Sequence, residues 1–221
     1  MTTTPNNAET PPAAPDPRGG GGRHAAYLAA EVSDDPTRRH ISPYSAREKV
    51  ARMLWAMVQG TAFAWSYPTW YGWRNFLLRR FGAGLHATVH IRRTARIECP
   101  WNLSMGANSS LGDFAIAYCL GPITIGGRAS VSQYAHLCAG THDYTKANMP
   151  LIRPPIVIGA DAWIAADAFV GPGVTVGEGA ILGARAVALK DLEPWTIYSG
   201  NPARAVKERP RPGASSGAAA P

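Results

Sequence analysis

The sequence of 221 residues has few cysteines, few charges and few acidic side chains. Three cysteines are too few for the disulfide framework of a small secreted protein, and they lack the paired spacing of a zinc site, which favours a reducing compartment. Charged residues make up only 17% of the chain, which argues against a coiled coil or a long-helix bundle. Because 15 acidic residues face 22 Lys and Arg, we expect an acidic partner: nucleic acid, an anionic lipid or a phosphorylated small molecule.

Both ends of the chain have little that could form a core. Residues 1–42 carry Thr, Pro, Ala and four consecutive glycines, with almost no side chain that could offset the entropy of ordering. We expect a disordered arm there, and not a signal peptide, because no apolar stretch follows a basic start. Residues 208–221 are again rich in Pro, Gly, Ala and Ser, which predicts a disordered tail.

Residues 43–84 are predicted to form a helical, aromatic-rich segment. Ser45 is a candidate N-cap for a first helix, and a second helix is expected to end near Gly82. The 21 residues 53–73 carry no charge, which is about the length of a membrane-spanning helix, but Pro68 and the density of Trp and Tyr argue against a span. Two interpretations stay open: the aromatic side chains cover one end of the next domain, or they lie on an anionic membrane surface beside the flanking arginines.

Aliphatic residues recur at every sixth position from Leu85 onward, a period that fits neither an α-helix nor a simple strand. Glycine often follows them, and a small or β-branched residue stands four positions after each. In such a hexad the aliphatic side chain fills the core, glycine permits close approach of the backbone, and the small residue fits a corner. Stacked coils of three hexads predict a solenoid over residues 85–207. The clearest run is Ile158, Ile164, Val170, Val176 and Leu182.

Six short segments, inside and outside the hexads, match a known protein family. Together with the hexads they resemble the hexapeptide-repeat acyltransferases, and within these the colanic-acid-biosynthesis acetyltransferase subgroup, over roughly residues 50–207. The resemblance implies a mainly β fold: a left-handed parallel β-helix, an exception to the right-handed crossover rule. We expect it to carry the N-terminal helical segment and a short C-terminal helix. The segments are residues 81–83, 100–103, 137–144, 155–159, 162–165 and 200–203.

The hexads break between Thr141 and Ile158, and His142 stands at the start of this break. Insertions in solenoids form loops, so we expect a functional loop over residues 143–155. In the sugar O-acetyltransferases of this superfamily a histidine at the matching place is the general base, and the resemblance assigns that role to His142. A neutral imidazole can take the proton of a sugar hydroxyl as its oxygen attacks a thioester. Asp143 is a candidate for orienting the imidazole, for binding substrate or for a simple turn.

The co-substrate implied by the resemblance is acetyl-CoA, bound between neighbouring subunits of a homotrimer, and no metal is expected. Small residues would leave room for pantetheine, while Lys and Arg could pair with the phosphates of CoA. Leu189 replaces the Thr that is usual in the family, so a hydroxyl contact is lost there. Tyr118 and Cys119 are candidates for the acceptor side, although relatives tend to carry Asn in place of Cys119. The family's CoA positions fall on Ala166, Ala184, Leu189, Lys190, Arg204 and Lys207.

The sequence therefore predicts an acetyl-CoA-dependent O-acetyltransferase that acts on a hydroxyl of a sugar or glycoconjugate in exopolysaccharide biosynthesis. We expect the protein in the cytoplasm. If the aromatic segment binds lipid, it would contact the inner face of the membrane. The alternative is a non-catalytic β-helix that serves as a scaffold or a membrane-associated assembly protein. Nucleic acid is disfavoured as a partner, because the basic residues follow the aromatic segment and the expected CoA site, and no nucleic-acid-binding motif is present.

Overall fold

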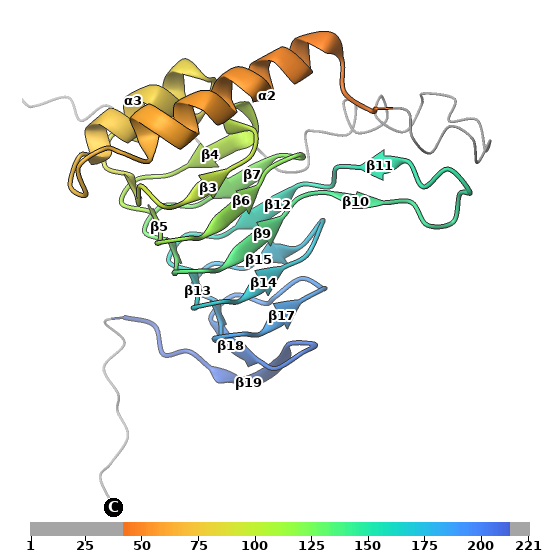
Figure 1. Ribbon diagram of the computed structural model, residues 1–221. Helices are drawn as coiled ribbons and strands as arrows, with labels where there is room; N and C mark the ends of the chain where they lie inside the picture. The colour runs from red at the N-terminus through yellow and green to blue at the C-terminus, as the bar shows by residue number, and fades with distance from the viewer. Residues whose placement is uncertain (1–41, 213–221) are drawn as a thin grey trace, which may run out of the picture.

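The computed structural model describes residues 42–212, so the predicted arm up to residue 41 and the predicted tail from residue 213 lie outside the described residues. The centre of the molecule is a β-solenoid in which short parallel strands stack coil on coil (Figure 1). Its strands form three sheets. The first contains β1 (Gly84–Leu85), β4 (Leu103–Met105), β7 (Ile123–Ile125), β12 (Ile156–Ile158) and β15 (Thr175–Val176).

The other two sheets complete the triangular cross-section of the solenoid. The third sheet is made of β3 (Arg96–Ile97), β6 (Ile116–Tyr118), β9 (His136–Cys138), β14 (Phe169–Val170) and β17 (Val187–Ala188). The second sheet, which is parallel except at its last pair, is made of β2 (His90–Ile91), β5 (Ser110–Leu111), β8 (Ser130–Val131), β13 (Trp163–Ile164), β16 (Ile181–Leu182), β18 (Thr196–Ser199) and β19 (Arg204–Glu208).

The hexad positions fill the interior, which confirms the predicted parallel solenoid. Val131, Ile164 and Leu182 are buried and stand in register on successive coils, so the aliphatic side chains form a continuous column. The glycine after an aliphatic residue is required by the spacing of the coils. A Cβ on Gly126 would lie 2.5 Å from the backbone nitrogen of Ala160 on the next coil, closer than any side chain can approach.

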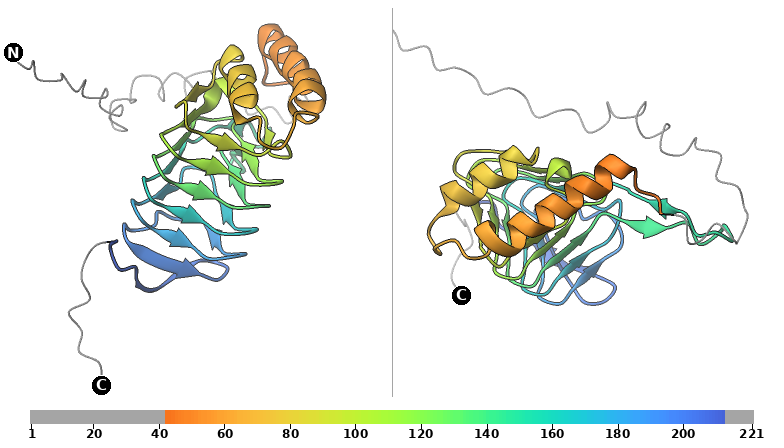
Figure 2. Two further views of the ribbon diagram at one scale, coloured as in Figure 1. Left: turned by 90° about the vertical axis from the view of Figure 1, so that its left-hand side faces the viewer. Right: turned by 45° about the horizontal axis from the view of Figure 1, so that its top comes forward.

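Two helices lie across the first coil and cover that end of the solenoid (Figures 1 and 2). The first, α2 (Ala46–Val58), continues into the π-helical turn η2 (Gln59–Phe63), and its N-cap Ser45 accepts a hydrogen bond from a backbone N–H of the first turn, as predicted. The second, α3 (Tyr71–Arg80), ends just before Gly82, whose φ is 90°. No helix within residues 42–212 is long and apolar enough to cross a membrane. A 3₁₀ turn, η3 (Pro100–Asn102), follows β3.

Helix α2 and the turn η2 that follows it are held on the first coil by two polar contacts, from Trp55 and from Gln59. The buried Trp55 donates from Nε1 to the carbonyl of Ile97 over 2.6 Å, and Gln59 Oε1 accepts the N–H of the same residue over 2.8 Å. Both backbone groups of Ile97 are therefore paired although the neighbouring strand lies on one side only.

Helix α3 closes the first coil in the same way, with two buried polar side chains. Arg74 donates from Nε to the carbonyl of Ile91, and its other nitrogens bond Ser66 Oγ and the carbonyls that precede the helix. Asn75 donates to the carbonyl of Val89 over 2.8 Å. These contacts satisfy backbone carbonyls at the open edge of the solenoid, where residues 42–212 provide no further strand to pair with them.

The prediction of a short C-terminal helix is wrong, because this part of the chain forms a strand. The chain turns at Gly200, which has a φ of 96°, and forms β19, antiparallel to β18. A strand is favoured there because β18 pairs with β16 and so completes the last coil, which a helix could not do. Order also continues into the predicted tail: Glu208 belongs to β19, and Arg209 donates to the carbonyls of Asp161 and Gly179 over 2.8 and 2.9 Å.

Candidate active site

The break in the hexads is a β-hairpin that projects from the side of the solenoid (Figure 1). Its strands are β10 (Thr141–His142) and β11 (Leu151–Ile152), which pair antiparallel, with Thr141 opposite Ile152. The loop predicted over residues 143–155 is therefore a paired hairpin with its tip at residues 143–150. The pairing limits the motion of His142, because the histidine stands directly opposite Leu151 in the ladder.

The exposed imidazole of His142 is oriented by one hydrogen bond. Its Nδ1 lies 2.7 Å from the backbone carbonyl oxygen of Met149 on the return side of the hairpin. Because a carbonyl oxygen only accepts, Nδ1 must carry the proton, and in the neutral ring Nε2 then keeps its lone pair. This is the tautomer that a general base acting through Nε2 requires.

Asp143 forms a turn and does not contact His142 in any described hydrogen bond. Its carboxylate accepts from the backbone N–H of Thr145 over 3.0 Å and from the hydroxyl of the same residue. These hydrogen bonds lower the pKa of Asp143 below its usual value, so the side chain is anionic at neutral pH. Of the three roles that the sequence left open, the turn is the one that these contacts support.

Tyr118 lies on the outer face of the third sheet, in a row of aromatic rings. Its ring centroid is 6.2 Å from that of His136, which in turn is 5.3 Å from Phe169 on the next coil. Burial raises the pKa of Tyr118, so its hydroxyl stays protonated at neutral pH and can donate a hydrogen bond. The row is half-buried and offers flat apolar surfaces of the kind that stack on sugar rings.

Cys119 lies in the interior, which corrects our expectation that it lines the acceptor side. Its thiol donates to the carbonyl of Cys99 and accepts the N–H of that residue, both over 3.2 Å. Burial raises the pKa of Cys119 to about 11, so the side chain is a neutral thiol at physiological pH. We do not retain it as a substrate contact.

Three of the six predicted CoA positions line one groove, of about 430 Å³, beside the last coil. They are Leu189, Lys190 and Arg204, and the groove also includes Tyr198 and Pro202. Both cations are exposed, so their charges are available to an anionic ligand.

The other three CoA positions lie outside this groove. Ala166 and Ala184 follow β13 and β16, at the corner between the second and third sheets, where Arg185 N–H donates to the carbonyl of Ala166 over 3.0 Å. Lys207 stands on β19 opposite Ile197 and does not line the groove. A single protomer therefore does not bring His142 and the six predicted CoA residues into one pocket.

Comparison with known proteins identifies the family. A family model for the bacterial transferase hexapeptide (six repeats) matches residues 155–188. The putative colanic acid biosynthesis acetyltransferase WcaF of Escherichia coli K12 is 45% identical over 156 residues, which cover 71% of this chain and 86% of that protein. The chain belongs to the bacterial hexapeptide-repeat acetyltransferases.

Two solved structures have the same fold as this hexapeptide-repeat acetyltransferase. A maltose O-acetyltransferase from Clostridium difficile 630 aligns with a TM-score of 0.66 and 23% identity, over 76% of this chain and 92% of that one. A hexapeptide-repeat-containing acetyltransferase from Vibrio cholerae, solved with acetyl coenzyme A, aligns with a TM-score of 0.67 and 24% identity, over 78% and 94%.

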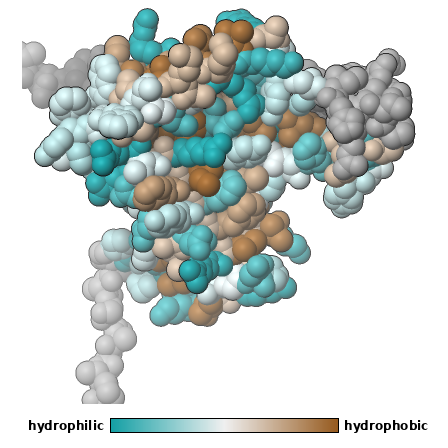
Figure 3. Space-filling model, viewed as in Figure 1, coloured by the Kyte–Doolittle hydropathy of each residue, from teal (hydrophilic) through white to brown (hydrophobic). Residues whose placement is uncertain are grey.

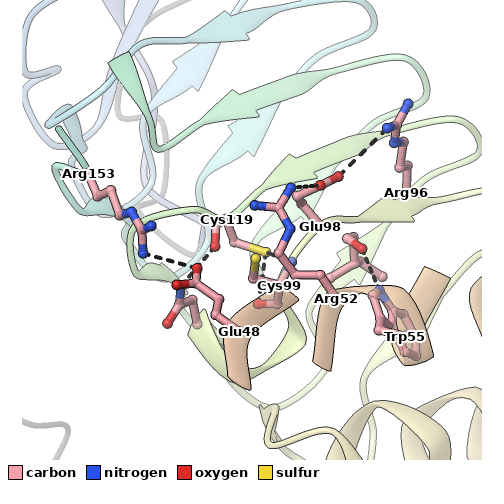
Figure 4. Close-up of polar contacts among 10 residues, drawn as sticks. Glu48, Arg52, Trp55, Arg96, Glu98, Cys99, Cys119 and Arg153 are labelled. Carbon is pink, nitrogen blue, oxygen red and sulfur yellow. Dashed lines mark hydrogen bonds and ion pairs between the residues drawn. The ribbon is translucent and has the colours of Figure 1, made fainter. Parts of the chain in front are cut away.

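A cluster that the sequence did not predict joins helix α2 of this acetyltransferase to the base of the hairpin (Figure 4). Arg153, just after β11, forms an ion pair of 3.2 Å with Glu48, and its guanidinium lies 5.1 Å from the ring centroid of Tyr44. The guanidinium of Arg52 lies 4.2 Å from the same ring centroid, and Arg52 is paired with Glu98 after β3. No local pattern could have revealed the cluster, because Glu48 and Arg153 are 105 positions apart in the sequence.

Within residues 42–212, no three His, Cys, Asp or Glu side chains are placed where they could hold a metal ion together.

Proposed function

We propose that this acetyltransferase moves an acetyl group from acetyl-CoA to a hydroxyl of a sugar or glycoconjugate, in exopolysaccharide biosynthesis. The observation that carries the proposal is the 2.7 Å contact between His142 Nδ1 and the carbonyl of Met149, which leaves Nε2 as the base. Two comparisons support it: a structural neighbour was solved with acetyl coenzyme A, and a 45% identical relative is named for colanic acid biosynthesis.

In the proposed reaction, Nε2 of His142 removes the proton of the acceptor hydroxyl while the oxygen attacks the thioester carbonyl carbon. The C–S bond then breaks as the tetrahedral intermediate collapses, giving an O-acetyl ester. The imidazolium returns its proton to the departing thiolate, so the histidine ends neutral and ready for another cycle. The Nδ1 hydrogen bond keeps the ring in one orientation through the cycle, because Nδ1 carries a proton in both the neutral and the charged ring.

The groove beside the last coil is the proposed place for CoA. Lys190 and Arg204 would pair with its phosphates, Leu189 would contact it through apolar atoms, and Ala166 and Ala184 would leave space along the corner of the coils. Lys207, on the exposed face of β19, would add a cation at the rim of the site. We also propose a left-handed winding of the solenoid, a homotrimer whose sites lie between subunits, and a cytoplasmic location.

The decisive experiment replaces the proposed base. In His142→Ala, acetyl transfer should fall by about 10²-fold or more while the protein keeps its melting temperature, because the exposed imidazole adds little to stability. His142→Gln tests orientation separately, since its amide can still donate to the Met149 carbonyl but cannot act as a base. His86→Ala is the matched control, because His86 is also exposed and lies on the first coil.

Two results would contradict the proposal. If His142→Ala kept most of the transfer rate, His142 would not be the base. If calorimetry with acetyl-CoA showed no binding to the wild-type protein, the non-catalytic scaffold would replace the enzyme as the best interpretation.

A further inference from the structure

The two helices on the first coil place polar as well as apolar side chains against the solenoid. On α2 and η2, Glu48, Arg52 and Gln59 each make a polar contact to the solenoid or the hairpin, and Trp55 is buried on the same side, whereas most other large apolar residues of α2 are exposed. On α3, the buried side chains include Arg74 and Asn75. Polar side chains are needed on this side because they pair the open backbone groups of the first coil, so fewer apolar side chains are buried there than under an ordinary surface helix.

Large apolar side chains of α2, of α3 and of the segment between them are left exposed. Between 42% and 84% of each of these side chains is exposed, which is far more than large apolar residues usually show. In the space-filling view, hydrophobic residues lie among hydrophilic ones along the upper edge, over the helices (Figure 3). We call this set the apolar cap face: Val50, Met53, Leu54, Met57, Trp65, Tyr67, Trp70, Trp73 and Phe76.

The charges around the apolar cap face are of one sign. Within residues 43–84 the exposed charged side chains are Arg47, Lys49, Arg79 and Arg80, and the segment's single carboxylate, Glu48, is neutralised by Arg153. A second copy docked face to face would bring these cations against one another, which disfavours a dimer through this face. An anionic lipid surface offers both an apolar interior and the opposite charge.

We infer that the apolar cap face binds the surface of a membrane that contains anionic phospholipids. Its composition fits the interfacial zone of a bilayer, where Trp and Tyr are enriched and where Lys and Arg contact lipid phosphates. The helices would lie in the plane of the interface and insert their apolar side chains among the head groups, without spanning the bilayer. The inference does not depend on the reaction proposed above.

The test measures binding of the full chain to vesicles by co-sedimentation. The wild-type protein should bind vesicles of phosphatidylcholine with about 30% phosphatidylglycerol at least about tenfold more tightly than vesicles of phosphatidylcholine alone, and added salt should weaken the binding. The triple variant Met53→Gln, Met57→Gln, Trp65→Gln should lose about tenfold or more of this affinity. The matched control is Trp163→Gln with Val206→Gln, two exposed residues on later coils.

A second variant tests the contribution of the cations separately from that of the apolar side chains. It also keeps the inference testable if the triple variant fails to fold. Lys49→Gln with Arg80→Gln should reduce binding at low salt but leave the weak binding to neutral vesicles unchanged. The inference is overturned if the wild-type protein does not bind anionic vesicles, or if the triple variant and the control bind equally well. It is also overturned if light scattering shows that the cap face joins two copies of the protein in the absence of lipid.

Discussion

At the scale of single residues, the surroundings of His136 oppose its positive charge. The ring lies between Tyr118 and Phe169, and its Nε2 is a buried atom that has no hydrogen-bond partner among the described residues. Burial, and then the nearby Arg96, lower the pKa of His136 below its usual value of 6.5. The folded protein therefore prefers the neutral imidazole.

This shift predicts a loss of stability in acid. As the pH falls through 6.5, the unfolded chain takes up a proton at His136 while the folded protein resists, so the free energy of unfolding decreases until the folded pKa is passed. In His136→Phe this contribution is absent. Between about pH 7.5 and about pH 5, the wild-type melting temperature should fall by roughly 2–4 °C more than that of the variant. Scanning calorimetry at equal protein concentrations measures it, and equal losses would contradict the assignment.

The position of Cys119 shows what the sequence could have predicted and did not. Side chains alternate along a strand, and Ala117 is the inward residue of β6, so Tyr118 must point outward and Cys119 inward again. The alternation was a sufficient signal for the burial of Cys119. The orientation of His142 had no such signal, because it depends on the Met149 carbonyl, whose position is set by the register of the hairpin.

At the scale of elements, the hairpin that carries His142 is held to the solenoid at its base. Arg153 is fixed from one side by Glu48 and from another by the ring of Tyr44. The backbone at Arg153 also packs closely on the solenoid at Gly121, where an added Cβ would lie 2.5 Å from the carbonyl oxygen of Arg153. Helix α2 therefore contributes to the candidate active site by positioning the hairpin, although it supplies no group to the chemistry.

Breaking the ion pair should loosen the hairpin. Glu48→Gln keeps the shape of the side chain but removes its charge, and a loss of about 1 kcal/mol for this half-buried pair would raise the population of the open hairpin about fivefold. Limited proteolysis within residues 143–150 should accelerate by that factor, and kcat should fall less than in His142→Ala. Arg47→Gln, an exposed neighbour on α2, serves as the control. An unchanged cleavage rate would show that the pair does not hold the hairpin.

The hexads predicted the solenoid strands because a period of six directly reports which side chains face the core. The cap of α2 was also readable, since Ser45 precedes the helix. The burial of polar side chains on α3 could not be predicted. Arg74 and Asn75 directly follow the uncharged residues 53–73, and nothing in the local sequence indicates that they point inward. The strand pair at the C-terminus could not be predicted either, because it is stabilised by pairing with β16 and not by its own local sequence.

At the scale of the whole molecule, the candidate active site is incomplete within one protomer. His142 projects on the hairpin next to β9, whereas Lys190 and Arg204 line the groove at the last coil, two coils further along the third sheet. With coils about 4.8 Å apart, these parts are separated by about 10 Å along the axis alone. A homotrimer that places the hairpin of one subunit beside the groove of the next would bring them together.

This arrangement predicts complementation between two inactive variants. His142→Ala lacks the proposed base, and Lys190→Ala with Arg204→Ala lacks the proposed phosphate contacts, so each should be nearly inactive alone at low acetyl-CoA concentration. In co-expressed mixed trimers about a quarter of the interfaces would combine an intact hairpin with an intact groove, and the transfer rate should recover to about that fraction of the wild-type rate. Mixing the purified homotrimers without subunit exchange is the control. No recovery on co-expression would place each site within one subunit.

The closure of both ends of the solenoid has a consequence for the solubility of the protein. A stack of parallel strands with open ends is a template on which further copies can add in register, as in a fibre. Here Arg74 and Asn75 donate hydrogen bonds to backbone carbonyls of the first coil. At the other end, β19 presents charged side chains such as Lys207 and Glu208 along its edge. The two ends thus limit growth to a fixed number of coils, so that the protein stays a particle of finite length.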